Sequence, residues 1–186
     1  MDLTYDLTQV PAATALAVAC ATAAAVIDHR RGFIPNALTY PCLLAGLALS
    51  LLHGGLVGLA IAVAGLLAAG FIFFVAFAAG SCGGGDVKLM AALGAILGLW
   101  PAIDVTLAAI MVGGVIAIVL MARRANIVEV LRSVGLFALL LPAGVKNAAQ
   151  LLAPKERHTL RFGIAAAGGL LWCLFLPELT PLSFVR

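Results

Sequence analysis

The stretch FAAGSCGGGDVKLMAALG, residues 77–94, places an acidic side chain between two apolar segments. Three glycines, at positions 83–85, precede Asp86, and the chain becomes apolar again after Lys88. Glycines permit backbone angles that other residues rarely adopt, and they would let a substrate strand come close. Irregular backbone at membrane depth is tolerated only where protein covers it or where it lines a wet cavity. We therefore expect a water-accessible cleft at this loop.

The chain around this loop has the composition of a polytopic membrane protein. Of its 186 residues, 64% are apolar and 10% are charged, whereas soluble domains are about 45–50% apolar and about 25% charged. A mean hydropathy of +1.17 agrees with this interpretation. The composition argues against a soluble globular enzyme, and no nucleic-acid partner is expected. The length predicts a single membrane-embedded domain over residues 1–186.

The predicted fold is all-α, with six helices that cross the bilayer. A helix needs about 20 mostly apolar residues to span it. The first segment is expected to be retained rather than cleaved as a signal peptide, because residues 1–9 carry Asp2 and Asp6 but no basic residue. Six spans would place both termini on the same side. The expected spans are residues 10–27, 37–53, 56–80, 87–101, 103–122 and 160–177.

Basic residues indicate the orientation of these spans. Ten of the eleven Lys and Arg residues fall on one side of the predicted topology, and only Arg186 falls on the other. Because basic residues concentrate in cytoplasmic loops, that side is expected to face the cytoplasm. Asp28 ends the first span and Asp86 opens the fourth, so both are predicted to lie at the same cytoplasmic boundary. No other carboxylate adjoins a long apolar span on that face.

Residues 123–159, between the fifth and sixth spans, are predicted to form a cytoplasmic or interfacial loop. Apolar residues recur at helical spacing within it, from Ile127 to Val134. This pattern favours an amphipathic helix that lies in the membrane interface, within residues 127–152. A re-entrant segment or a seventh span is the alternative, and a seventh span would move the C-terminus to the other side.

Asp28 and Asp86 together have the chemistry of an acid–base pair. Two carboxylates held close in a low-dielectric site cannot both ionise readily, so the pair shares one proton and titrates as a unit. The ionised member can draw a proton from water, while the protonated member can donate to a carbonyl oxygen. The two residues are therefore candidates for peptide hydrolysis without a covalent intermediate.

Residues that follow each aspartate are candidates for supporting roles. Pro35 suits the first turn of the second span, and Asn36 can cap that helix or brace a neighbouring loop. Lys88 can anchor at lipid headgroups or shift the pKa of Asp86. The Cys and His residues are too scattered in the sequence to form a zinc site, so neither a metal nor a cofactor is expected.

Three motifs, in matching order, resemble one protease family. The pattern Asp-x6-Pro-Asn runs from Asp28 to Asn36, and the pattern Gly-x-Gly-Asp-x-Lys runs from Gly83 to Lys88. Together they resemble the type IV prepilin peptidases, the GxGD aspartic proteases of the bacterial inner membrane. The segment LRFGIAAAGG, which begins at Leu160, resembles a late motif of that family, with an arginine where a proline is common.

The resemblance implies a membrane aspartic endopeptidase with Asp28 and Asp86 as its catalytic pair. Its substrate would be a prepilin, whose short basic leader is removed next to the pilin's hydrophobic helix, at the cytoplasmic face of the inner membrane. The chain is similar to the short form that serves Flp/Tad-type pili, without the methyltransferase domain of longer members. Residues that match the family's motifs are expected to position the loop or the substrate: Gly83, Gly85, Lys88, Pro35, Asn36, Phe162 and Gly163.

Two other functions remain open from the residues alone. A small transporter could relay protons through the two acids, since acids at membrane depth often do so, but no acid marks the midplane of such a path. A non-catalytic assembly factor of a pilus or secretion machine would also keep this architecture. Taken singly, Asp28 could pair with Arg31, and Asp86 could simply begin a helix. The expected partners are the prepilin and the lipid bilayer, and a second copy of the chain in a homo-oligomer is a further alternative.

Overall fold

The computed structural model describes residues 10–78, 82–124 and 162–181. The chain divides into two compact units, one of residues 1–113 with 161–186 and the other of residues 114–160. Of the second unit, only the helical segment that continues from residue 113 is described. The predicted amphipathic helix between the fifth and sixth spans therefore lies outside the described residues, and the single-domain expectation stays a prediction. The packing described below is that of the first unit.

Helix α1, Pro11–Arg31, begins and ends at residues suited to those positions. A proline at the start of a helix costs no hydrogen bond, because the first N–H groups of a helix have no intrahelical partner. The helix ends at Gly32, whose φ of 71° is left-handed and whose N–H donates to the Asp28 carbonyl at 2.9 Å. The sequence places no such stop at the predicted end, residue 27. As a result Asp28 lies inside the last turn of α1 rather than beyond it.

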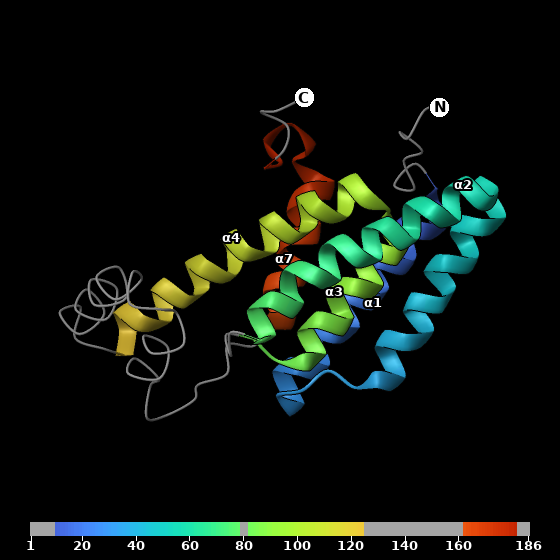
Figure 1. Ribbon diagram of the computed structural model, residues 1–186. Coiled ribbons are helices and arrows are strands. Elements are labelled where there is room, and N and C mark those ends of the chain that lie inside the picture. Colours follow the sequence, from blue (N-terminus) through green and yellow to red (C-terminus); the bar gives the residue numbers. More distant parts are fainter. Residues whose placement is uncertain (1–9, 79–81, 125–161, 182–186) are drawn as a thin grey trace, which may run out of the picture. The chain divides into compact units, whose positions relative to one another are not determined.

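Helix α2, Asn36–Ala78, consists of two arms that meet at a glycine. Gly55 has φ 58° and ψ −147°, a conformation outside the helical region that a residue without a Cβ can adopt. The arms coincide closely with the predicted spans 37–53 and 56–80. In Figure 1 the first arm rises and the second descends, so that α2 forms a hairpin.

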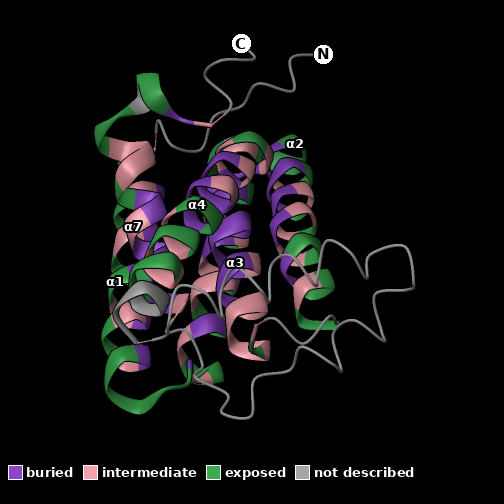
Figure 2. Ribbon diagram, turned by 90° about the vertical axis from the view of Figure 1, so that its left-hand side faces the viewer, coloured by how far each residue is buried: buried purple, intermediate pink, exposed green. Residues whose placement is uncertain are grey.

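Helix α3, Gly84–Leu97, packs between the two arms of α2 through contacts that only small residues allow. A Cβ added at Gly46 of the first arm would lie 2.7 Å from Ile96 Cγ1, and one added at Gly65 of the second arm would lie 2.6 Å from the Gly98 carbonyl carbon. Small residues let helix backbones approach in this way inside membranes. Figure 2 shows the resulting concentration of buried positions along α3.

Two further helices complete the described chain. Helix α4, Leu99–Arg124, follows α3 after Gly98, whose φ is 81°. Helix α7, Phe162–Phe175, is followed by a single 3-10 turn, η3, Pro177–Leu179. A Cβ added at Gly169 would lie 2.5 Å from the Ala109 backbone nitrogen, so α7 also approaches α4 closely.

The described residues are all-helical, and three of their helical segments are long and apolar enough to cross a bilayer: Pro11–Arg31, Asn36–Ala78 and Leu99–Val119. Helices α3 and α7 have 14 residues each, which corresponds to a rise of about 21 Å. The hydrocarbon core of a bilayer is about 30 Å thick. The all-α class is therefore confirmed for the described residues, whereas six full spans are not. The predicted fourth span, 87–101, is wrong in extent because Gly98 ends the helix early.

Gly94→Ala is expected to lower the free energy of unfolding by about 1–3 kcal/mol, the usual cost of overpacking. The added methyl group would lie against the Gly65 carbonyl and 2.9 Å from the Leu66 nitrogen. The measurement is the thermal unfolding midpoint of the detergent-solubilised protein. Gly114→Ala is the matched control, since a Cβ there meets nothing within 4 Å. Equal midpoints for the two variants would contradict the close contact between α2 and α3.

Candidate active site

Several helix ends lie together at one end of the first unit. Figure 1 shows the end of α1 and the starts of α2, α3 and α7 toward the lower side, while α1 begins and α7 ends on the opposite side. We call this lower side the Asp28 end. It brings together segments that are far apart in the sequence, including all three that carry the predicted motifs.

Asp28 is buried in the last turn of α1, with 6% of its surface exposed. Its Oδ2 accepts a hydrogen bond from the N–H of Gly163, at 2.9 Å. Gly163 is the second residue of α7, and N–H groups in the first turn of a helix have no intrahelical partner. The positive end of the helix dipole also favours a negative charge there. The contact therefore gives this buried carboxyl group a fixed donor at the start of α7.

The start of α7 lies so close to α1 that position 163 has little room for a side chain. A Cβ at this position would lie 3.0 Å from Asp28 Cβ and 3.1 Å from the Ala24 carbonyl oxygen. The preceding residue, Phe162, packs against Phe73 of α2, with ring centroids 4.7 Å apart and an interplanar angle of 53°. The two residues predicted from the late motif thus lie at the Asp28 end, where they hold α7 against α1 and α2.

Asp86 is the third residue of α3 and caps the start of that helix. Its Oδ2 accepts a hydrogen bond from the N–H of Gly83, at 2.9 Å, and its own N–H donates to the Gly83 carbonyl at 3.1 Å. The expectation that Asp86 begins a helix is therefore confirmed. Since the Asp86 side chain is only partly buried, this capping role leaves it accessible at the Asp28 end.

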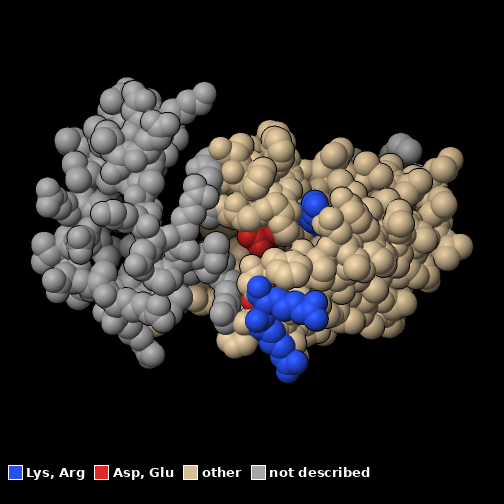
Figure 3. All heavy atoms as spheres, turned by 90° about the horizontal axis from the view of Figure 1, so that it is seen from below, with Lys and Arg blue, Asp and Glu red and all other residues tan. Residues whose placement is uncertain are grey.

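The two carboxylates interact electrostatically. Asp86 lies outside the three candidate spans. Burial of its carboxyl group raises the pKa of Asp86, the N–H of Gly83 opposes that rise, and the negative charge of Asp28 adds to it. Seen from the Asp28 end, acidic side chains reach the surface between basic ones (Figure 3). Because the charge of Asp28 bears on the ionisation of Asp86, we refer to these two residues as the coupled pair.

The glycines before Asp86 act differently from the sequence-based expectation. Gly83 has φ −87° and ψ 154°, which is ordinary extended backbone, and the next two glycines are helical. The expectation that these glycines adopt angles forbidden to other residues is therefore wrong. Position 85 instead requires a glycine because Ile34 lies very close to it. A Cβ there would lie 3.2 Å from Ile34 Cβ and 3.4 Å from the Ile34 carbonyl oxygen. The approaching segment is the protein's own link between α1 and α2.

The Pro-Asn motif meets α3 at the same end. The Pro35 carbonyl accepts the N–H of Leu38 at 3.1 Å, so Pro35 directly precedes the first turn of α2. Lys88 Nζ donates to Asn36 Oδ1 at 2.8 Å, so the Asn36 side chain contacts helix α3 and not a loop. Lys88 Nζ also lies 5.6 Å from the centroid of the Tyr40 ring. The sequence offered no signal for Tyr40, because an aromatic residue in an apolar segment is unremarkable.

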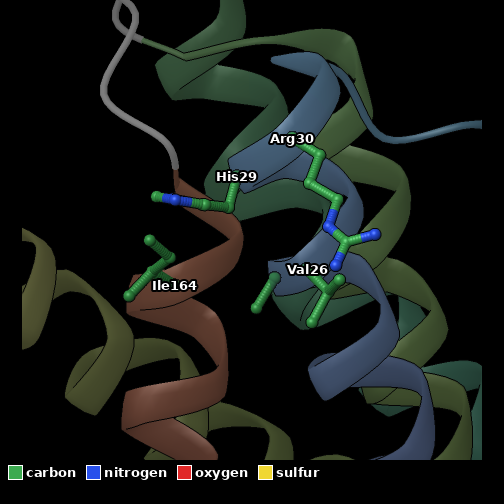
Figure 4. A pocket seen from close by; sticks show the side chains of 5 residues that line it. Val26, His29, Arg30 and Ile164 are labelled. Atoms are coloured by element: carbon green, nitrogen blue, oxygen red, sulfur yellow. The ribbon is translucent and has the colours of Figure 1, made fainter.

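A shallow pocket of about 350 Å³ is lined by residues of α1 and by Ile164 of α7 (Figure 4). His29 and Arg30 extend into its surroundings in different directions, and Ile164 faces it from α7. Asp28 itself does not line this pocket, so it is separate from the coupled pair. Within the described part of the chain, no group of three or more His, Cys, Asp or Glu side chains could hold a metal ion.

Comparison with known proteins points to one family. Residues 15–118, more than half of the chain, match the type IV leader peptidase family. Two curated relatives, from Burkholderia pseudomallei strains 1026b and K96243, are both named prepilin leader peptidase/N-methyltransferase and are 38% identical over 122 residues. The alignment covers 59% of this chain and 38% of each relative, so the chain spans little more than a third of their length. No solved structure matches it.

The matched region contains both residues of the coupled pair, most of α1, and all of α2 and α3. The motifs that suggested the resemblance, from Asp28 to Asn36 and from Gly83 to Lys88, fall inside it as well. On these grounds the chain belongs to the type IV leader peptidase family.

Proposed function

We propose that this protein is a membrane aspartic endopeptidase that removes the basic leader of type IV, Flp-like prepilins. Asp28 and Asp86 are its catalytic pair. The observation that carries the proposal is the placement of two carboxyl groups, one from the last turn of α1 and one from the first turn of α3, at the same end of the helices. Family membership supports the same reaction, since the matched relatives are named prepilin leader peptidases. Their names also include an N-methyltransferase, and the proposal concerns leader removal alone.

The surroundings of the two carboxyl groups support different roles in the reaction. Asp28 accepts a hydrogen bond from the N–H of Gly163 at the start of α7, which fixes the position of its carboxyl group. The burial of Asp86 and the charge of Asp28 favour the protonated form of Asp86. Asp28 is therefore assigned as the base that activates water, and Asp86 as the acid.

Hydrolysis then follows in two steps that restore the pair. Asp28 takes a proton from water while the water oxygen attacks the scissile carbonyl carbon, and Asp86 gives its proton to the carbonyl oxygen. The resulting gem-diol collapses when the C–N bond breaks. Asp28 returns its proton to the leaving nitrogen, and Asp86 recovers one from a diol hydroxyl. One water is consumed, and no covalent intermediate with the protein forms.

We place the Asp28 end at the cytoplasmic face of the bacterial inner membrane, with six passes in the chain. Helices in the first unit alternate in direction, as such a path requires (Figure 1). Arg30 and Arg31 end α1 beside Asp28, and Lys88 follows Asp86, which suits a cytoplasmic face. The short helix α3 is mostly buried by other helices from Leu89 onward, so it does not need the full length of a lipid-exposed span.

The proposed substrate has a basic leader and a hydrophobic helix. Positive charge at the Asp28 end does not attract such a leader, so recognition is assigned to the apolar part of the prepilin and to local polar contacts near the pair. Exposed apolar side chains cover much of α2, including Leu67, Phe71 and Phe74. These side chains provide surfaces for lipid or for the substrate's helix.

Asp28→Asn and Asp86→Asn are each expected to abolish leader removal, by at least about a thousandfold, because asparagine keeps the shape of the side chain but cannot exchange the proton. The measurement is cleavage of a purified prepilin by the protein in membranes or detergent, followed by gel shift and mass spectrometry. Glu178→Gln, which removes an exposed carboxylate from η3, is the matched control and should retain activity.

Undiminished cleavage by either aspartate variant would show that the carboxylate replaced in that variant is not catalytic. A proton-flux assay in liposomes separates the transporter alternative, which requires flux that depends on the same two residues. If the wild type cleaves no prepilin although it is correctly inserted, the assembly-factor alternative is favoured.

The cleavage rate is expected to decline as the pH rises through the pKa at which the pair loses its shared proton. Because burial and the charge of Asp28 raise the pKa of Asp86, this decline should lie above the ordinary titration range of an aspartate. The measurement is kcat against pH, with the unfolding midpoint recorded over the same range to exclude denaturation. A decline centred on the ordinary aspartate range would contradict the proposed coupling.

Gly163→Ala is expected to reduce kcat by about 10- to 100-fold, because small displacements of a catalytic group have effects of this size. The added Cβ would lie 3.0 Å from Asp28 Cβ and would push α7 away from the carboxylate that its N–H contacts. The assay is the prepilin cleavage described above. Gly114→Ala, with no atom near its added Cβ, controls for a glycine-to-alanine change in a helix, and equal rates for both variants would rule out the proposed role of Gly163.

A further inference from the structure

A hydrogen bond between two side chains connects the start of α2 to the first turns of α3. Lys88 Nζ donates to Asn36 Oδ1 at 2.8 Å, across 52 positions of sequence. Asn36 is the first residue of α2, and Lys88 stands two residues after Asp86. The bond lies at the surface, and its charged donor makes it stronger than a neutral hydrogen bond would be there, so it links the two helix starts.

A second contact fixes the same two segments on the other side of Asp86. Gly85 approaches Ile34 so closely that a Cβ would lie 3.2 Å from Ile34 Cβ, and Ile34 is only 7% exposed. Gly85 immediately precedes Asp86, whereas Lys88 follows it. The first turns of α3 are therefore held against the link between α1 and α2 on both sides of the carboxylate.

The link in turn begins at Asp28. Gly32 N–H donates to the Asp28 carbonyl at 2.9 Å and ends α1, and only Phe33, Ile34 and Pro35 separate Gly32 from α2. A short series of contacts thus runs from Asp28 through the link to Asp86. The bond between Asn36 and Lys88 is the hydrogen bond between side chains in this series.

The Lys88 ammonium is held in place by more than this one acceptor. It lies 5.6 Å from the Tyr40 ring centroid, one turn further along α2, within the range of a cation–π contact. Both partners belong to α2. The position of the Lys88 ammonium therefore suits a residue that joins α3 to α2 better than one that extends toward lipid headgroups.

We infer that Lys88 is a positioning residue, whose bond to Asn36 sets the place of Asp86 relative to Asp28. The inference rests on the proposed peptidase function, because it concerns the geometry of that catalytic pair. Displacement of a catalytic group by about 1 Å can lower a rate by about a hundredfold. Loss of the bond should therefore reduce kcat while the substrate's KM changes little.

Two other roles for Lys88 lead to different results. If Lys88 acted only through its charge on Asp86, Lys88→Met would shift the pH dependence of kcat, and Asn36→Leu would have no effect. If Lys88 anchored the helix at headgroups, Lys88→Arg would be fully active and Asn36 would again be dispensable. Positioning through the bond instead requires that the two residues depend on each other.

The test is a double-mutant cycle on prepilin cleavage with Lys88→Met, Asn36→Leu and the double variant. Each single variant is expected to lose about 10- to 100-fold in kcat, with KM and the pH dependence unchanged, and the double variant should lose no more than either single one. Asn36→Asp, which keeps an acceptor for the ammonium, should retain most activity. Arg31→Met, which removes an exposed positive charge at the same end, is the matched control and should behave as the wild type.

Additive losses in the double variant, wild-type kcat in Asn36→Leu, or a pH shift confined to Lys88→Met would each overturn the inference. A readout without catalysis separates it from the peptidase proposal. Asn36→Cys and Lys88→Cys, in a variant with the native cysteines replaced, should be joined by a short bismaleimide in membranes, whereas Leu52→Cys with Lys88→Cys should not. Absence of that crosslink overturns the inference even if the wild type is active, while a crosslink in the cysteine variant together with no prepilin cleavage by the wild type refutes the peptidase proposal alone.

Discussion

The hydrogen bond from the Gly163 N–H to Asp28 Oδ2 is the contact on which the arrangement of the site depends. It is 2.9 Å long, joins residues 135 positions apart, and is buried. It forms only because Gly163 has no Cβ, which would otherwise lie 3.0 Å from Asp28 Cβ. The same approach sets Phe162 against Phe73 of α2. A single close contact therefore anchors α7 and supplies a buried carboxylate with a donor at a helix start.

The second carboxylate is held by the packing of α3. Small residues let α3 lie between the arms of α2, where Gly46 and Gly65 leave room for its backbone. Close packing of this kind leaves little freedom for the helix to slide or rotate. The bond to Gly83 then orients the Asp86 side chain at the Asp28 end. The proposed proton-sharing pair is thus a consequence of rigid helices rather than of a flexible loop.

Much of this architecture could be predicted from the sequence, because it follows from local signals. Apolar segments of sufficient length predicted helices at nearly the observed positions, and Gly32 and Pro35 mark the link between α1 and α2. The placement of Asp28 and Asp86 at one end follows from the direction in which successive helices run. The predicted role of the glycines before Asp86 was wrong, since a row of glycines does not reveal whether it serves an unusual φ or a close approach.

The sequence by itself determined the helical class, the approximate helix ends and the two candidate carboxylates, because hydrophobicity and helix-ending residues act over a few neighbouring positions. The tertiary structure alone decided which groups those carboxylates contact. The Gly163 N–H meets Asp28, Ile34 meets Gly85, and Asn36 meets Lys88. Such pairs depend on the rotation and spacing of helices from distant parts of the chain, and those are set by the volume of side chains packed between them, which leaves no local pattern in the sequence.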